Sequence, residues 1–262
     1  MSRANLLSLA TNEWLKEASS KSRLAWNAGM VLMIFAYMIG ALVFPIYKGN
    51  YMGSELLLAL ADRFPDSSEL TLVRIAVVDI VFPALLPLPA ALWPGTQTTM
   101  SLTGEKDKNT LECLLLIPVS EKELLLAKTA AAALPAVAVT WLAYGVTVLA
   151  AAGFMSTELT SYLLNSRLLM MAFLSVPVLA VMSAFGGIVV SVGVADSKTA
   201  LSLGFLPGAV GAVCFGLVYL ANITFSIMFV LLVTLLVAGL AVVMLGIAVS
   251  RFDRESLLMR FK

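Results

Sequence analysis

The sequence of 262 residues contains no histidine and only two cysteines, Cys113 and Cys214. Without histidine the chain lacks the commonest general base and the commonest metal ligand of proteins. The two cysteines are too few, and too far apart in the sequence, for a disulfide framework or a metal cluster. We interpret both as small apolar side chains and predict no metal site.

Motifs of nucleotide hydrolysis and of membrane hydrolases are missing as well. No GxxxxGK[ST] run occurs, and the nearest candidate, residues 193–199, has no glycine directly before its lysine and no strand before it. HExxH and GxSxG are also absent. The sequence therefore predicts a chain that is not an enzyme, with no catalytic residue and no cofactor of its own.

Charged residues are scarce, at 13% of the chain, whereas a soluble domain averages about 25%. Hydrophobic residues make up 60%, and the mean hydropathy is +0.97. These values predict an integral membrane protein embedded in the lipid bilayer. The net charge of +1 gives no electrostatic reason to expect a nucleic-acid partner.

We predict an all-α fold with six transmembrane helices in a single domain, since each span needs roughly 20 mostly apolar residues. Residues 1–23 are predicted to form an interfacial amphipathic helix, and residues 250–262 a basic tail. Short polar connections are expected at 153–167 and 195–199. The predicted spans cover residues 24–47, 75–100, 124–152, 168–194, 200–220 and 225–249.

Lysine and arginine are distributed unevenly among the segments outside the spans. The N-terminal segment, the charged stretch 104–128 and the C-terminal tail hold four each and the 195–199 turn holds one, of 17 in the chain. The loops on the opposite side hold the remaining four. The positive-inside rule therefore predicts that both termini and the charged stretch lie in the cytoplasm.

The second predicted span is rich in proline, with Pro83, Pro87, Pro89 and Pro94. Each proline removes a backbone hydrogen bond, and in a bilayer the freed carbonyl must be satisfied by protein or by cavity water. We predict a bent helix that packs against neighbours or a pathway. Asp79 is expected near its outer end, within reach of lipid headgroups, and a substrate or ion site there is the alternative interpretation.

Two features of the later spans carry further predictions. Lys128 stands at the start of the third span and is expected to extend its ammonium group to the aqueous side. Gly204, Gly208 and Gly211 lie at spacings that permit close contact between helices in the fifth span.

The charged stretch contains two consecutive helix-start patterns. Asn109 can cap a helix with Glu112 at its third position, and Ser120 with Glu123 repeats that spacing. Pro118 cannot continue the first helix. We predict a short helix at 110–117, a break, and a new helix that begins at Glu121.

The same stretch resembles the signature of ABC-2-type transporter permeases, in which a run similar to E-(x)n-G-T-L-E-x-L-L-x-x-P-V-S-x-x-E-L-L-x-x-K joins spans 2 and 3. The resemblance is dense over about 25 residues, and its place after the second of six spans agrees. One departure is Asn109, where many relatives carry glycine. The residues that carry it are Glu105, Asn109, Thr110, Leu111, Glu112, Leu114, Leu115, Pro118, Val119, Ser120, Glu123, Leu124, Leu125 and Lys128.

This resemblance implies that the stretch is a cytoplasmic coupling helix docked on a separate ABC ATP-binding subunit, which binds ATP and Mg. It implies an exporter of the cytoplasmic membrane, of prokaryotic type, in which two permease copies or two related permeases form a dimer. Gly204, Gly208 and Gly211 are the candidate dimer interface. Asp79, Pro83 and the pair Pro87 and Pro89 are the candidate residues for a pathway or for bending.

A different class of protein fits the residues without the resemblance. A membrane scaffold or regulatory anchor that transports nothing could recruit a soluble partner through residues 104–123. An ion channel is a third interpretation, disfavoured because no filter-like motif occurs in the spans.

Overall fold

The computed structural model describes residues 68–107, 121–194, 196–220 and 227–251, together with five single positions before residue 68. Every regular element in these ranges is a helix, which confirms the predicted all-helical class for this part of the chain. The predicted interfacial helix, the first span, the coupling helix at 110–117 and the C-terminal tail lie outside the described ranges.

The second predicted span consists of two helices. α4 covers Glu69–Leu85 and begins at Ser68, whose hydroxyl accepts a backbone hydrogen bond at 3.3 Å. α5 covers Leu88–Asp107. Leu86 and Pro87 form the turn between them, where the proline supplies no amide hydrogen to the helix ladder. The interruption therefore lies at one of the prolines from which the sequence predicts bending.

α7 covers Glu121–Phe154 and begins at the residue that the capping pattern predicts. Pro135 lies inside it. Leu134, Leu142 and Leu149 are 66%, 63% and 72% exposed, and their spacing of seven to eight residues places them along one face of the helix. A continuous apolar face of this kind fits contact with lipid.

The connection predicted at 153–167 is wrong as a loop, because it contains the helix α8, Thr157–Leu163. Ser156 caps this helix by accepting a hydrogen bond from the Leu159 amide at 3.3 Å. Serine followed two residues later by Glu158 is a helix-start signal. The turn of the chain at this end is therefore helical and partly buried.

The fourth predicted span consists of three consecutive helical segments. α9 covers Ser166–Met170, the π-helix η1 covers Met171–Ser175, and α10 covers Val176–Gly193. The Val176 amide donates to Met171 O, one residue further back than in an α-helix. Pro177 follows directly and has no amide to donate, so the wider turn keeps the helical path continuous at a proline.

The fifth predicted span is wrong as a single helix. α11 covers Ser197–Leu203 and α12 covers Leu206–Leu220. Gly204 lies in the turn between them. Pro207 stands at the second position of α12, where its missing amide costs no helical hydrogen bond. This proline is the signal in the sequence for the second helix start.

α13 covers Ile227–Arg251 and agrees with the sixth predicted span. Within the described ranges, three helical stretches are long and apolar enough to cross a membrane: Lys122–Phe154, Thr157–Gly193 and Ile227–Ser250. Residues 198–213 form a shorter apolar helical stretch. The chain is thus a membrane-embedded helical protein, and the full count of six spans stays a prediction.

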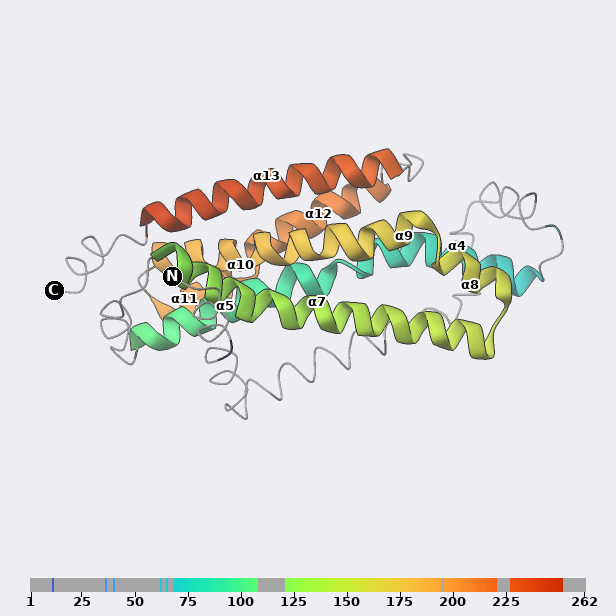
Figure 1. The fold of residues 1–262 in the computed structure, drawn as a ribbon, viewed down its shortest axis with the longest axis horizontal. Helices are drawn as coiled ribbons and strands as arrows, with labels where there is room; N and C mark the ends of the chain where they lie inside the picture. Colours follow the sequence, from blue (N-terminus) through green and yellow to red (C-terminus); the bar gives the residue numbers. More distant parts are fainter. Residues whose placement is uncertain are drawn as a thin grey trace.

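The helices α7, α10 and α13 extend along the long axis of the molecule, with α4 and α8 at one end and α11 at the other (Figure 1). α5 packs most extensively against α10 and also contacts α7, α12 and α11. Because protein surrounds it, α5 can carry buried polar side chains that a lipid-facing helix could not. These are Gln97, Thr98, Thr99 and Thr103.

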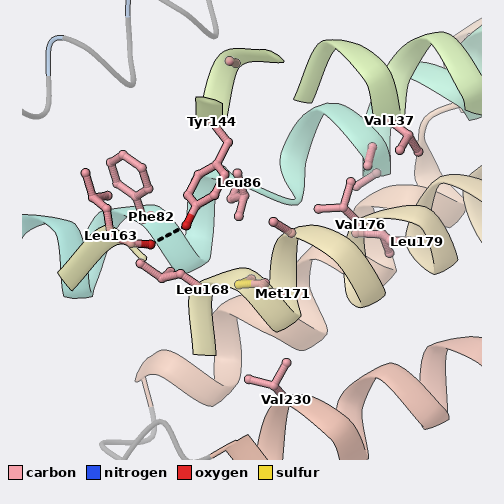
Figure 2. Close-up of a cluster of buried hydrophobic side chains, with 14 of the residues drawn as sticks. Phe82, Leu86, Val137, Tyr144, Leu163, Leu168, Met171, Val176, Leu179 and Val230 are labelled. Carbon is pink, nitrogen blue, oxygen red and sulfur yellow. Dashed lines mark hydrogen bonds between the residues drawn. The ribbon is translucent and has the colours of Figure 1, made fainter. Parts of the chain in front are cut away.

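Two apolar clusters hold the bundle together. The larger joins α4, α7, α8 and α10, and Figure 2 shows Tyr144 of α7 donating its hydroxyl hydrogen to Leu163 O of α8 within it. The smaller lies where α5, α7, α10 and α13 meet, at the end that bears the charged stretch. Its buried members are Leu102, Leu124, Leu125, Phe185, Ile188, Val192 and Ala248.

Candidate functional site

The two ends of the charged stretch meet in a buried ion pair. Lys128 Nζ on α7 lies 2.7 Å from Glu105 Oε1 on α5 and donates a second hydrogen bond to Ser101 Oγ at 3.2 Å. The Lys128 side chain is 1% exposed and that of Glu105 is 15% exposed. The prediction that Lys128 reaches the aqueous side is therefore wrong. Its ammonium group pairs with the Glu105 carboxylate on the neighbouring helix α5 instead.

This ion pair fixes the geometry of the ends of the stretch. A lysine ammonium removed from water loses its hydration, and only a close carboxylate with further hydrogen bonds compensates for that loss. Glu105 and Ser101 stand one helical turn apart on α5, so both face Lys128. The pair thereby holds the end of α5 against the first turns of α7.

Lys106 joins the same end of α5 to α10. Its ammonium group donates to Ser191 O and, at 3.4 Å, to Val194 O. Both acceptors belong to the last turn and the cap of α10, where carbonyls have no partner within the helix. A cation at this position also interacts favourably with the negative end of the helix dipole. Adjacent residues of α5 therefore hold two different helices.

Residues 108–120 connect the two helices that the Glu105–Lys128 pair joins, and they lie outside the described ranges. Most of the predicted coupling residues fall there. Their arrangement stays a prediction, and Glu105 is the member of the set that the structure describes. The set outside the described residues is Asn109, Thr110, Leu111, Glu112, Leu114, Leu115, Pro118, Val119 and Ser120.

The middle of α5 is bound to α10 by hydroxyl groups. Ser183 on α10 donates to Ala91 O and accepts from the Gly95 amide at 3.0 Å. Thr98 Oγ1 lies 3.0 Å from Ala184 O, and Thr99 Oγ1 lies 3.0 Å from Gly187 O. Such hydroxyl-to-carbonyl contacts between closely packed helices are typical of membrane proteins.

Glycines let these backbones approach. A Cβ atom on Gly95 would lie 2.5 Å from Gly204 O and 2.8 Å from Ser183 Oγ. One on Gly187 would overlap Gly95 O. Gly187 of α10, Gly204 of the turn before α12 and Gly208 of α12 therefore lie directly against α5, whereas Gly186 lies against Pro207 of α12.

The three glycines of the predicted dimer interface lie against other helices of the same chain. A Cβ atom on Gly208 would overlap Ala91 O of α5, one on Gly204 would lie 2.6 Å from Thr99 Oγ1, and one on Gly211 would overlap Leu179 of α10. This face is thus covered within one chain. A role of these glycines in a dimer stays a prediction, and it has to account for the helices of the same chain that already pack against them.

Asp79 and the predicted bending residues lie at the opposite part of the bundle. Tyr162 of α8 donates its hydroxyl hydrogen to Asp79 Oδ1. Pro83 lies inside α4, Pro87 in the turn and Pro89 at the second position of α5. The carboxylate therefore has a protein partner in α8, and its role in a pathway stays a prediction.

Outside the spanning segments, the turn before α11 contains one perturbed carboxyl group. The Thr199 hydroxyl donates to Asp196 Oδ2 at 2.6 Å and the Thr199 amide donates to the same oxygen at 2.8 Å. These two hydrogen bonds hold the pKa of Asp196 below its usual value. Among the described residues, no group of three or more histidine, cysteine, aspartate or glutamate side chains could hold a metal ion.

Sequence reasoning missed Ser183, Lys106 and Tyr162. Each is a partner in a contact between helices distant in sequence, and the spacing of one segment does not report such a partner. The sequence around Ser183 does contain one indication of this contact. The small residues Ser183-Ala184 and Gly186-Gly187 would allow another helix to approach α10 closely.

The sequence matches the model of one protein family over residues 13–199, and that family is described as "ABC-2 family transporter protein". The matched range includes α4, α5, α7 to α10 and the whole charged stretch. No curated protein and no solved structure matches the chain.

Proposed function

The chain belongs to the ABC-2 family of transporter proteins, and on that basis we propose that it is the permease subunit of an ATP-driven ABC transporter. It would export a substrate across the cytoplasmic membrane. A separate subunit would bind and hydrolyse ATP with Mg, and a second permease copy or a related permease would complete the pore.

The observation that carries the proposal is the Glu105–Lys128 ion pair. The family resemblance assigns residues 109–117 to a coupling helix, and the pair fixes both helices from which that segment emerges. Such a fixed connection suits a segment that has to transmit force, because a displacement of the segment then moves α5 and α7 together. Lys106 extends the contact to α10.

The α4–α5 interruption supports movement in response to such a force. Leu86 and Pro87 separate the two helices, and Pro87 leaves one amide fewer in the ladder there. A push at the Asp107 end of α5 would therefore change the angle between α5 and α4 more readily than it would bend either helix. In this proposal, that change opens or closes the pathway.

Replacing Leu111 and Leu115 by aspartate tests the docking step. We expect loss of association with the ATP-binding subunit, since charged side chains would replace the apolar face that the resemblance assigns to docking. The matched control replaces Leu257 and Leu258 of the predicted cytoplasmic tail by aspartate. Copurification of the ATPase with each variant, after checking membrane insertion, is the measurement, and equal recovery in both would contradict the proposal.

Vesicles that contain the chain and its ATPase separate transport from recruitment alone. A transporter gives ATP-dependent flux that disappears in the Leu111 and Leu115 variant. A scaffold or regulatory anchor binding through residues 104–123 gives association without flux of any compound.

A further inference from the structure

Ser183 contacts α5 in an unusual way. In a regular helix the amide of Gly95 bonds to the carbonyl of Ala91, four residues earlier. Ser183 Oγ, from α10, bonds to both members of this pair: it donates to Ala91 O and accepts from Gly95 N at 3.0 Å. A side chain from one helix thus bonds to both members of one step in the hydrogen-bond ladder of another helix.

The Ser183 hydroxyl is enclosed by the protein, next to two glycines. Ser183 is fully buried. A Cβ atom on Gly95 would lie 2.8 Å from its oxygen, and one on Gly208 of α12 would lie 2.6 Å from it. Two glycines from two helices therefore make the space that the hydroxyl occupies, and its contact with α5 is specific to this position.

Further bonds join α5 and α10 on the cytoplasmic side of Ser183. Thr98 and Thr99 reach carbonyls of α10 at 3.0 Å each, and Lys106 binds the last turn of α10. If α5 slid along α10, these contacts between the two helices would break together. The threonine hydroxyls would then have only the carbonyls of their own helix, Pro94 O and Gly95 O, as acceptors.

We propose that Ser183 is a positioning residue of the transport cycle, and this inference depends on the proposed function. Its hydroxyl fastens the Ala91–Gly95 turn of α5 to α10, so that a force on the coupling segment moves both helices as one body about the Leu86-Pro87 turn. Lys106 provides the second attachment at the end of α5. Ser183 transmits the displacement and contacts no substrate.

The test compares Ser183→Ala with Ser191→Ala. Both serines are fully buried on α10, and both changes remove one oxygen. Within the described residues, Ser191 Oγ has no hydrogen-bond partner, so Ser191→Ala controls for the loss of a buried hydroxyl. In Ser183→Ala, the Ala91 carbonyl and the Gly95 amide can bond to each other, and α5 loses its attachment at that turn.

Spin labels at Gly104 of α5 and Gly246 of α13 report the arrangement, in a chain whose Cys113 and Cys214 are changed to serine. A Cβ atom at either glycine meets open space, and α13 packs along α10. The full-length protein is measured in vesicles, first alone and then with the ATPase subunit trapped by ATP, Mg and vanadate.

For the parent and for Ser191→Ala, we expect one narrow distance distribution that nucleotide trapping leaves in place. For Ser183→Ala, we expect a broadened or shifted distribution without nucleotide and a further shift on trapping, because α5 then moves without α10. A Ser183→Ala distribution identical to that of Ser191→Ala in both conditions would overturn the inference.

Two further arms keep the outcome decisive. If Ser183→Ala does not accumulate in membranes, Lys106→Met is measured in its place, because it removes the second attachment of α5 to α10. Lys106→Met should broaden the distance distribution, and Lys106→Arg should keep it narrow. An unchanged distribution in Lys106→Met would then refute the inference. If the parent binds no ATPase, the proposed function fails, whereas the nucleotide-free comparison still judges the attachment of α5 to α10.

Discussion

Replacing Lys128 by methionine should destabilise the protein strongly, because it leaves Glu105 without its 2.7 Å partner at the end of α5. Methionine keeps most of the length and apolar volume of the lysine stem, so the change removes charge and hydrogen bonds more than packing. Loss of one partner from a buried ion pair costs about 3–5 kcal/mol. The Lys128 side chain is 1% exposed and that of Glu105 15%, so the ammonium is fully buried and the carboxylate partly buried.

The matched control is Lys122→Met, the same substitution on the same helix at an exposed position. Exposed substitutions change stability by no more than about 0.5 kcal/mol. The third member is the double variant Glu105→Gln with Lys128→Met, which removes both charges. A pair of neutral groups leaves no uncompensated charge, so the double variant should recover much of the lost stability.

Thermal unfolding in one detergent, followed by circular dichroism, measures all three variants against the parent. For a chain of this size, 1 kcal/mol shifts the midpoint by about 2–4 °C, so Lys128→Met should lower it by roughly 6–20 °C. The reasoning is refuted if Lys128→Met has the same unfolding midpoint as Lys122→Met, or if the double variant is no more stable than Lys128→Met.

Two other predictions follow from the glycine contacts and from the turn before α11. Gly208→Ala should lower the free energy of unfolding by about 1–3 kcal/mol, because its methyl group would overlap Ala91 O. Gly239→Ala is the control and should not destabilise the protein, because a Cβ atom there meets open space. Equal unfolding midpoints for the two variants would contradict this prediction. Asp196 has a lowered pKa because Thr199 donates to it, so it stabilises the fold above its unfolded-state pKa of about 3.9, and that contribution is lost as pH falls through the folded pKa. Asp196→Asn keeps a capping oxygen but does not titrate, so its unfolding midpoint should fall less between pH 5 and pH 2 than that of the parent; parallel curves would exclude this role.

Local rules predicted helix starts where the determinants lie within a few residues. The Ser120 and Glu123 spacing placed the start of α7 at Glu121, as the structure has it. The proline pattern placed an interruption in the second predicted span. Pro207 carried the same kind of information for α12, and the interpretation of the fifth span as one helix overlooked it.

Contacts between distant segments were beyond those rules. From α7 alone, the Lys128 side chain is expected to reach water. Its burial is explained only by Glu105, which lies on the neighbouring helix α5. Gly204 in the turn before α12, and Gly208 and Gly211 in α12, lie in close contact with other helices, as their spacing predicted. Which helix they meet depends on how α5, α10 and α12 fold together.

The low hydrophobicity of α5 follows from its position and constrains its movement. A helix enclosed by α7, α10 and α12 meets few lipid tails, so threonine hydroxyls there can bond to carbonyls of neighbouring helices. Those same bonds resist sliding, because sliding would break the contacts to α10 and leave each hydroxyl with only the carbonyls of its own helix. α5 can change its position at low cost only together with the helix that holds its acceptors, or about the turn at Pro87 where its ladder is already interrupted. The sequence that makes α5 polar thus favours rotation of an α5–α10 unit over independent motion of α5.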